Sequence, residues 1–253
     1  MWEILEAYQV YGGVNMNYSD LKVKVFADGA NINEMLNLYH EGLVKGFTTN
    51  PSLMKKAGII DYKEFAKEVL TNIKDLPVSF EVFSDNFETM EKEANILSSL
   101  GKNVYVKIPI MNTKGESSIP LIKKLSYKGY HLNVTAIFTI NQVREVVEVL
   151  NPGVKSIVSI FAGRIADTGT DPIQLMKESS KICKTNEGVE LLWASCREVY
   201  NIVEADKCNC EIITVTNDVL KKLSNMGKDL YEYSLETVKD FYKDASSLGF
   251  SIL

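Results

Sequence analysis

Short β-branched runs alternate with longer amphipathic stretches along the chain from Lys22 onward. Runs of this kind are typical of buried parallel strands, and the stretches between them are typical of the helices that connect such strands. The pattern predicts eight strands, at Val23–Asp28, Gly46–Asn50, Val78–Phe83, Val104–Pro109, His131–Ile137, Ser156–Phe161, Glu190–Ser195 and Glu211–Val215. Eight strands that are each followed by a helix predict an α/β fold, a single (β/α)8 TIM barrel.

The segments between the predicted strands have the spacing of amphipathic helices. Helices are predicted at Asp61–Lys74, Phe87–Leu100, Asn141–Leu150, Pro172–Lys184 and Asn217–Ser224. The structural alternative is a doubly wound open sheet, which would carry a glycine-rich phosphate loop after its first strand. The sequence contains neither Gly-x-Gly-x-x-Gly nor Gly-x-x-x-x-Gly-Lys. We therefore favour the closed barrel.

The two ends of the chain fall outside the eight strand and helix units. Residues 1–20 precede the first predicted strand and are expected to form an N-terminal extension with an extra helix, although Met16 is an alternative start. Ser234–Leu248 is expected to be an extra C-terminal amphipathic helix that packs on a neighbouring subunit. Residues 21–253 would then form one barrel domain, since a chain of 253 residues is within reach of a single barrel.

Charge and composition exclude several classes of protein. The formal net charge is −5, whereas a nucleic-acid-binding surface needs clustered basic residues. No apolar stretch approaches the ~20 residues that span a bilayer. The four cysteines have no Cys-x-x-Cys spacing and the chain has two histidines, so we expect reduced thiols and no structural zinc. Without a signal-peptide pattern at the start, we expect a cytoplasmic protein that binds neither nucleic acid nor membrane.

Polar residues recur with a constant spacing of 26 residues, each near the end of a predicted strand. They are Glu81, Lys107, Asn133 and Ser159. One strand and helix unit fits this spacing, so these side chains are expected at equivalent positions in consecutive units.

Lys107 lies inside the apolar run Val104–Pro109, where a solvated lysine has little reason to be. Removal from water disfavours the charged ammonium, and a neutral amine can attack a carbonyl and form a Schiff base. The alternative is a lysine at a strand end that extends its ammonium to solvent. This segment by itself does not decide between the two, and the neighbours of Lys107 favour the first.

Side chains alternate across a strand, so residue parity predicts which of them face the barrel axis. In the fourth strand Lys107 and Tyr105 would point inward, and the same parity sends four further polar residues inward. These are Asp28, Glu81, Asn133 and Thr135. They would meet near the carboxyl ends of the strands, where catalytic residues of this architecture lie.

The converging side chains have complementary chemistry. Asp28 and Glu81 are carboxylates that can accept and donate protons, and Thr135 can hold a water between Glu81 and Lys107. Taken singly, an acidic residue at a strand end is as typical of a helix cap or an arginine partner. Beside a buried lysine, acid–base chemistry is the favoured interpretation.

Two arginines lie just beyond consecutive predicted strands. Arg164 follows Phe161-Ala162-Gly163, and Arg197 follows Ala194-Ser195-Cys196. Guanidinium groups near helix N-termini can bind a phosphate. The alternative is two surface salt bridges, of Arg164 with Asp167 and of Arg197 with Glu198, and we favour the phosphate. Cys196 has no adjacent histidine or second cysteine and is interpreted as a packing residue.

Five segments taken together resemble the successive motifs of the transaldolase family. They are Gly46–Leu53, Val106–Pro109, Leu132–Thr135, Ser159–Asp167 and Ala194–Arg197. The size and the tail helix resemble the small branch of that family, which also contains fructose-6-phosphate aldolases. The resemblance covers residues 23 to about 245 in the right order and leaves out residues 1–20.

The resemblance implies a Schiff-base barrel enzyme without metal or organic cofactor. Lys107 would bind the C2 ketone of a ketose phosphate, and Asp28 would take the C4 hydroxyl proton as the C3–C4 bond breaks. Glu81 and Thr135 would orient the water that shuttles protons. Asn50, Asn133 and Ser159 would bind the dihydroxyacetone unit, and Arg164, Ser195 and Arg197 would bind the phosphate.

The family contains both transferases and aldolases. Its transferases resemble this chain in having Glu at position 81 and Phe at position 161, whereas its aldolases have Gln and Tyr there. A transaldolase is therefore expected, with a fructose-6-phosphate aldolase and a non-catalytic sugar-phosphate-binding barrel as alternatives. The small branch also implies a homo-oligomer, a pentamer or a decamer.

Two positions depart from the family pattern. Asp28 is followed by Gly29-Ala30-Asn31 rather than by Thr and a small residue, and Cys196 stands where an aromatic residue is frequent. Both positions would border the sugar pocket, so they point to a different ketose or acceptor and remove no catalytic group.

Overall fold

The computed structural model describes residues 18–249 and residue 252. Lys22–Lys221 form one compact unit, and the described residues outside that range belong to a second unit. The extra helix expected within residues 1–20 lies outside the described residues, except for a short 3-10 helix, η1, at Tyr18–Asp20.

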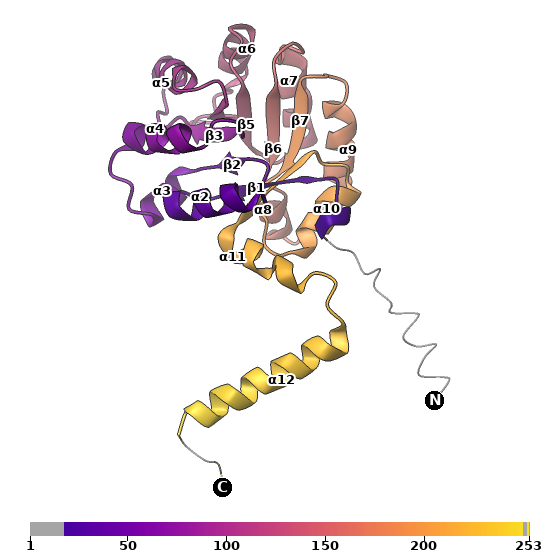
Figure 1. Cartoon of the computed structure of the whole chain (residues 1–253). Coiled ribbons are helices and arrows are strands. Elements are labelled where there is room, and N and C mark those ends of the chain that lie inside the picture. Colours follow the sequence, from indigo (N-terminus) through magenta and orange to yellow (C-terminus); the bar gives the residue numbers. More distant parts are fainter. Residues whose placement is uncertain (1–17, 250–251, 253) are drawn as a thin grey trace. The chain divides into compact units, whose positions relative to one another are not determined.

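Eight parallel strands of the first unit form a closed barrel, in which each strand pairs with the next and β8 pairs with β1 (Figure 1). The strands are β1 (Lys24–Asp28), β2 (Phe47–Thr48), β3 (Val78–Glu81), β4 (Val104–Pro109), β5 (Leu132–Ile137), β6 (Ser156–Ile160), β7 (Val189–Trp193) and β8 (Ile212–Thr216). The predicted (β/α)8 fold is confirmed.

Helices follow the strands around the outside of the barrel (Figure 1). They are α2 (Ile32–Glu41), α3 (Pro51–Lys56), α4 (Tyr62–Asn72), α5 (Phe87–Ser99), α6 (Ile119–Tyr127), α7 (Ile140–Val149), α8 (Ala162–Ala166), α9 (Ile173–Cys183), α10 (Tyr200–Lys207) and α11 (Asn217–Leu220). The segment predicted as one helix at Asn217–Ser224 is α-helical only to Leu220 and continues as a 3-10 helix, η2 (Lys221–Asn225).

Strand β2 is shorter than predicted because a helix begins at its end. Asn50, predicted to be the last strand residue, is the N-cap of α3, and its side-chain oxygen accepts a hydrogen bond from the backbone N–H of Leu53 at 3.0 Å. Pro51 occupies the first helical position, where the missing N–H costs nothing. The same capping places Asn50 at the rim of the barrel.

The barrel interior contains a packed apolar layer. Phe26, Tyr105, Ile157, Leu192 and Ile212 form one buried cluster contributed by five strands. The opposite faces of the strands pack under the helices, as Val104, Val106 and Ile108 of β4 do, each at most 3% exposed. The inner layer leaves room for a cavity at each end of the barrel.

The second unit contains a long C-terminal helix, α12 (Leu230–Ser247). It begins four residues before the predicted start at Ser234, because Asp229 caps it by accepting hydrogen bonds from the backbone N–H groups of Tyr231 and Glu232. No residue of α12 is buried. None of the helices that the structure describes is long and apolar enough to cross a membrane.

Candidate active site

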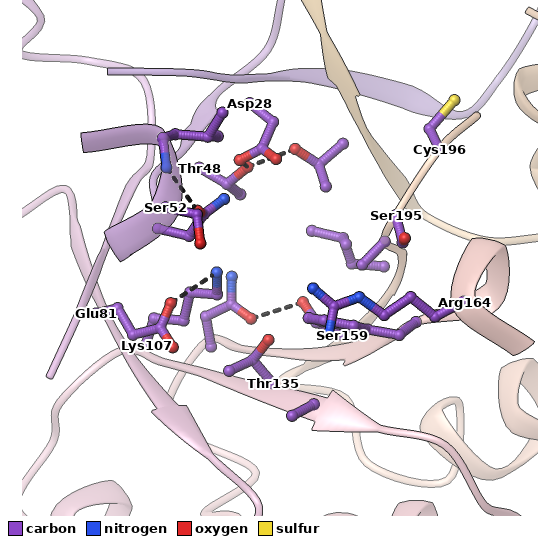
Figure 2. A pocket seen from close by; sticks show the side chains of 18 of the residues that line it. Asp28, Thr48, Ser52, Glu81, Lys107, Thr135, Ser159, Arg164, Ser195 and Cys196 are labelled. Atoms are coloured by element: carbon purple, nitrogen blue, oxygen red, sulfur yellow. Dashed lines mark hydrogen bonds and ion pairs between the residues drawn. The ribbon is translucent and has the colours of Figure 1, made fainter. Parts of the chain in front are cut away.

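A pocket of about 470 Å³ opens at the carboxyl ends of the strands (Figure 2). All eleven residues selected from the sequence line it. They are Asp28, Asn50, Glu81, Lys107, Asn133, Thr135, Ser159, Phe161, Arg164, Ser195 and Arg197. They come from seven of the eight strands or the loops that follow them, so the barrel brings together side chains that are up to 169 positions apart in sequence.

Lys107 lies at the bottom of this pocket and is only 7% exposed. Its Nζ is 3.0 Å from Oε2 of Glu81 and donates a hydrogen bond to the backbone oxygen of Thr49 at 3.1 Å. Figure 2 shows the two side chains pointing toward each other. A lysine that extends to solvent does not fit this burial, and the two acceptors fix the nitrogen beside a carboxylate that can take its proton.

Asp28 ends β1 on another side of the pocket and is held by a chain of hydroxyl groups. Oγ1 of Thr48 donates to Oδ1 of Asp28 at 2.8 Å, and Thr48 is also hydrogen-bonded to Thr214 of β8. Burial raises the pKa of Asp28, and the charge of Lys107 and the Thr48 hydrogen bond offset part of that rise. Asp28 is therefore a stronger base than an ordinary aspartate.

Thr48 and Thr214 were missed in the sequence, although both line the pocket. Two-residue alternation applied to the second and eighth predicted strands would have found them. Thr48 is the inward residue of β2, two residues before Asn50, and Thr214 is the central residue of β8. Ser52 also lines the pocket, but it lies at the start of helix α3, so strand alternation does not predict its direction.

A row of amide and hydroxyl groups covers the side of the pocket next to Lys107. Nδ2 of Asn133 donates to Oγ of Ser79 at 3.0 Å, and Oγ of Ser159 donates to Oδ1 of Asn133 at 2.6 Å. Oγ1 of Thr135 is buried and has no hydrogen-bond partner among the described residues. A buried hydroxyl that lines a polar pocket is suited to bind a water or a substrate hydroxyl.

The pocket wall contains two non-glycine residues with left-handed backbone. Ala136, at the register shift in β5, has φ of 58°, and Ser195, after β7, has φ of 64°. A Cβ at Gly163 would lie 1.7 Å from the carbonyl oxygen of Ser195, so only glycine fits where α8 meets the end of β7. This close approach positions the segments that carry Arg164 and Arg197, and strained backbone of this kind is concentrated at functional sites.

The two arginines line the same side of the pocket but have different partners. The guanidinium of Arg164 lies 5.0 Å from the centre of the Phe161 ring, and no ion pair of Arg164 occurs within the described chain. Arg197 forms an ion pair with Asp167. The salt bridges considered from the sequence, Arg164 with Asp167 and Arg197 with Glu198, are therefore not the ones formed. Two cations at one end of the pocket suit a dianionic group.

Cys196 lines the pocket without the features of a nucleophile. It is 8% exposed, and its Sγ donates to the backbone oxygen of Glu198 at 3.3 Å. Burial raises the pKa of the thiol to about 12, so it stays protonated near neutral pH. All four cysteines are buried and free.

The other departure from the family pattern, Gly29-Ala30-Asn31, also has a structural role. Asn31 is the N-cap of α2, and its side-chain oxygen accepts a hydrogen bond from the backbone N–H of Glu34 at 3.2 Å. Gly29, Ala30 and Asn31 line a smaller cavity that also reaches Asp28. The departure thus changes the surface next to Asp28 and leaves its carboxylate in place.

Comparison with solved structures supports the fold alone. A putative phosphonomutase from Burkholderia cenocepacia J2315 superposes with a TM-score of 0.55 over 88% of this chain and 94% of that one. The sequence identity is 10%, so this similarity carries no functional argument.

Sequence comparison identifies much nearer relatives. A probable transaldolase from Caldicellulosiruptor saccharolyticus is 37% identical over 204 residues, which cover 80% of this chain and 89% of the relative. A probable transaldolase from Methanococcus maripaludis strain C7 is 38% identical, with 80% and 90% covered. The family model for transaldolase/fructose-6-phosphate aldolase matches residues 25–252. With its barrel and its pocket, the chain belongs to the transaldolase/fructose-6-phosphate aldolase family.

Proposed function

We propose that this protein is a transaldolase that works through a Schiff base on Lys107. It would move a dihydroxyacetone unit from a ketose phosphate, of the fructose 6-phosphate or sedoheptulose 7-phosphate type, to an aldose phosphate. The observation that carries the proposal is the position of Lys107, which is 7% exposed, 3.0 Å from Glu81 and in the same pocket as Asp28. No metal or organic cofactor has a role in the proposed reaction.

Imine formation begins with proton transfer from the Lys107 ammonium to Glu81, 3.0 Å away. The neutral amine then attacks C2 of the ketose, and a proton moves from the attacking nitrogen to the C2 oxygen to give a carbinolamine. The protonated Glu81, through a water held by Thr135, gives a proton to the C2 hydroxyl, which leaves as water. The partnerless hydroxyl of Thr135 is suited to hold that water.

Carbon–carbon cleavage then uses Asp28. Its carboxylate takes the proton of the C4 hydroxyl, the C3–C4 bond breaks, and the electron pair moves into the iminium to give an enamine on Lys107. The C4 carbon leaves as the aldehyde of an aldose phosphate. The raised pKa of Asp28 favours this step, because a more basic carboxylate accepts the hydroxyl proton more readily.

Transfer is completed when the enamine attacks the aldehyde of a second aldose phosphate and Asp28 returns its proton to the new C4 oxygen. Water then hydrolyses the iminium and frees Lys107. Asn50, Asn133 and Ser159 would bind the hydroxyls of the dihydroxyacetone unit throughout. Phe161 has no hydroxyl that could protonate the enamine or order a water beside it, which favours transfer over release.

The phosphate of donor and acceptor would bind at Arg164, Ser195 and Arg197. Arg164 is free of acidic partners within the described chain, whereas Arg197 is paired with Asp167, whose side chain is 53% exposed. Exposed pairs of this kind are weak, so a phosphate dianion can displace the carboxylate. Asp167 would then act as a competing counterion, which binds Arg197 when the pocket is empty.

A homo-oligomer is proposed to form through α12. Tyr231, Leu235, Val238 and Tyr242 recur at helical spacing, and their exposed fractions run from 39% to 76%. A second copy of this chain would cover this stripe, in a pentamer or decamer. Light scattering should give a multiple of 28.4 kDa for the natural chain and a smaller mass for Val238→Lys. The four free thiols fit a reducing, cytoplasmic setting.

Borohydride trapping tests the central step. Incubation with fructose 6-phosphate and borohydride should reduce the imine and add a dihydroxyacetone-sized mass to Lys107, which peptide mapping locates. Lys24, Lys45, Lys102 and Lys155 at the other end of the barrel should stay unmodified. Lys45, Lys102 and Lys155 form no ion pair within the described residues, and Lys24, although paired with Glu190, has a side chain that is 42% exposed. An adduct at a different lysine would overturn the assignment.

A second measurement separates the proposal from its alternatives. A transferase consumes fructose 6-phosphate only when an acceptor aldose phosphate is present, whereas an aldolase releases free dihydroxyacetone without one. A non-catalytic barrel would bind fructose 6-phosphate and give neither product nor adduct. Progress curves with and without acceptor decide among these three.

A further inference from the structure

A second cavity of about 470 Å³ lies at the opposite end of the barrel, and we refer to it as the amino-end cavity. The inward parity that builds the candidate active site also builds this one. Lys24 lies four residues before Asp28 in β1, and Tyr105 lies two residues before Lys107 in β4. His131 and Lys155 precede Asn133 and Ser159 in the same way. The packed apolar layer separates the two cavities.

Lysine is the most frequent residue type in the wall of the amino-end cavity. The ammonium-bearing residues are Lys24, Lys45, Lys102 and Lys155, and the carboxylate-bearing residues are Asp75, Glu187 and Glu190. Two of these carboxylates are already engaged, because Glu190 forms an ion pair with Lys24 and Asp75 accepts a hydrogen bond from the hydroxyl of Tyr39 at 2.6 Å. Within the described residues, Lys45, Lys102 and Lys155 form no ion pair.

Tyr105 supplies a donor without a partner at the inner end of this cavity. Its side chain lines the cavity and is only 6% exposed, yet its hydroxyl makes no hydrogen bond within the described chain. Burial, and to a lesser degree Glu190, raise its pKa to about 12, so the hydroxyl stays protonated and can donate. A ligand oxygen in the cavity could accept a hydrogen bond from this hydroxyl.

His131 contributes an uncharged wall beside this donor. Its ring centre is 5.0 Å from that of Tyr105, and its Nδ1 is buried without a partner among the described residues. Burial and the charge of Lys155 lower its pKa, so the ring is neutral near pH 7. The positive charge of the cavity therefore comes from its lysines.

We propose that the amino-end cavity binds a small phosphate-bearing anion. A phosphate presents oxygens in several directions and carries up to two negative charges, which matches ammonium groups spread around a bowl and a hydroxyl donor at its inner end. A monocarboxylate has one charge and two coplanar oxygens, so it would satisfy fewer of these donors. The ligand is free phosphate or a phosphate monoester of a small polyol, which the cavity volume accommodates.

The test separates this site from the candidate active site by removing the arginines of the latter. Inorganic phosphate is titrated calorimetrically, at constant ionic strength, into the full chain carrying Arg164→Ala and Arg197→Ala. Binding of one phosphate per chain is expected to remain. Adding Lys45→Gln and Lys155→Gln should weaken this binding at least about tenfold, because two charge-assisted hydrogen bonds are lost. Absence of binding in the arginine variant would overturn the proposal.

Two further variants make the result specific. Tyr105→Phe retains the ring and its packing, and should weaken phosphate binding by about tenfold if the hydroxyl donates to the ligand. The matched control, Lys63→Gln with Lys92→Gln, removes two exposed lysines of α4 and α5 and should leave the affinity unchanged. An equal loss in this control, or unchanged affinity in both cavity variants, would show nonspecific attraction and contradict the site.

Sorbitol 6-phosphate distinguishes the two sources of the phosphate group. It has no carbonyl and therefore cannot form an imine with Lys107. Tighter binding than that of inorganic phosphate, lost in the Lys45→Gln and Lys155→Gln variant, identifies a phosphate monoester as the ligand. Equal affinities identify the free anion. This experiment does not depend on catalysis, so its failure would leave the proposed function untouched.

Discussion

The two ends of the barrel hold cavities of equal volume built from the same inward positions, but they place lysine very differently. At the carboxyl end Lys107 is 7% exposed and in contact with Glu81. At the amino end lysines surround the opening, and the side chain of Lys24 is 42% exposed. A lysine removed from water beside a carboxylate can become a nucleophile, whereas an exposed one remains a point charge.

The direction of the helices adds to this difference. Helices that follow parallel strands begin at the carboxyl ends of those strands, so their N-termini, with partial positive charge, surround the candidate active site. Their C-termini surround the amino end, where the dipoles oppose anion binding. In the proposed scheme two arginines therefore suffice for a phosphate at the carboxyl end, whereas four lysines supply the positive charge at the amino end.

Replacement of Lys107 should have the largest effect. Lys107→Met retains the chain length but cannot form an imine, so turnover should fall by at least about 10⁴-fold, as when an enzyme nucleophile is removed. The steady-state rate of aldose phosphate formation measures this loss. Lys63→Gln, an exposed lysine of α4, is the control and should keep full activity. Substantial turnover by Lys107→Met would place the reaction elsewhere.

Asp28→Asn should separate imine formation from bond cleavage. The amide cannot take the C4 hydroxyl proton, so kcat should fall by about 10²- to 10⁴-fold. Borohydride should still trap fructose 6-phosphate on Lys107, because Glu81 and Thr135 are unchanged. Loss of trapping together with turnover would mean that Asp28 acts on imine formation instead.

Arg197→Ala should act on binding more than on chemistry. Loss of a charge-assisted contact with phosphate should raise KM for phosphorylated acceptors by about 10- to 100-fold. KM for unphosphorylated aldehydes should change little. Asp167→Asn removes the competing counterion of Arg197 and should lower KM for phosphorylated acceptors by up to about fivefold, since exposed ion pairs are weak. Equal changes for both kinds of acceptor would exclude a phosphate role.

Thr48→Val should have the smallest effect, which should appear as a change in the pH dependence of kcat/KM. The hydroxyl of Thr48 stabilises the ionised form of Asp28 and lowers its pKa, so removing it raises the pKa further. The base is then protonated over a wider range, and the acid limb of kcat/KM against pH should move to higher pH. Thr214→Val, one hydrogen bond farther from the carboxylate, should shift the limb less in the same direction. An unmoved limb would assign it to another group.

Much of the candidate site could be predicted because alternate residues of each barrel strand face the barrel axis. Lys107, Glu81 and Asn133 follow from strand ends and two-residue alternation, and the structure brings them into one pocket. Thr48 and Thr214 obey the same rule in β2 and β8. The amino-end cavity follows from the same alternation, because inward residues nearer the start of each strand, such as Lys24 and Tyr105, line it.

Other features could not be predicted because they depend on side-chain conformers and on long-range approach. The pairing of Arg197 with Asp167, rather than with Glu198, requires knowing how α8 and the loop after β7 meet. That contact depends on Gly163, because the carbonyl oxygen of Ser195 occupies the space that a Cβ at this position would need. Helix α12 begins at Leu230 because the side chain of Asp229 accepts hydrogen bonds from the backbone N–H groups of Tyr231 and Glu232. Helix ends predicted from sequence are commonly wrong by a few residues, because several nearby residues could act as the cap.

The sequence by itself determined the strand order and the inward set of polar residues, because apolar periodicity and chain alternation are local properties. The tertiary structure decided the burial of Lys107, since a lysine at a strand end can also extend to solvent. The tertiary structure decided which groups touch: Lys107 with Glu81, Asp28 with Thr48, Arg197 with Asp167. The first two pairings follow from strand register, which sets Glu81 beside Lys107 and Asp28 beside Thr48. The closure of β8 against β1 brings Thr214 to Thr48 in the same way.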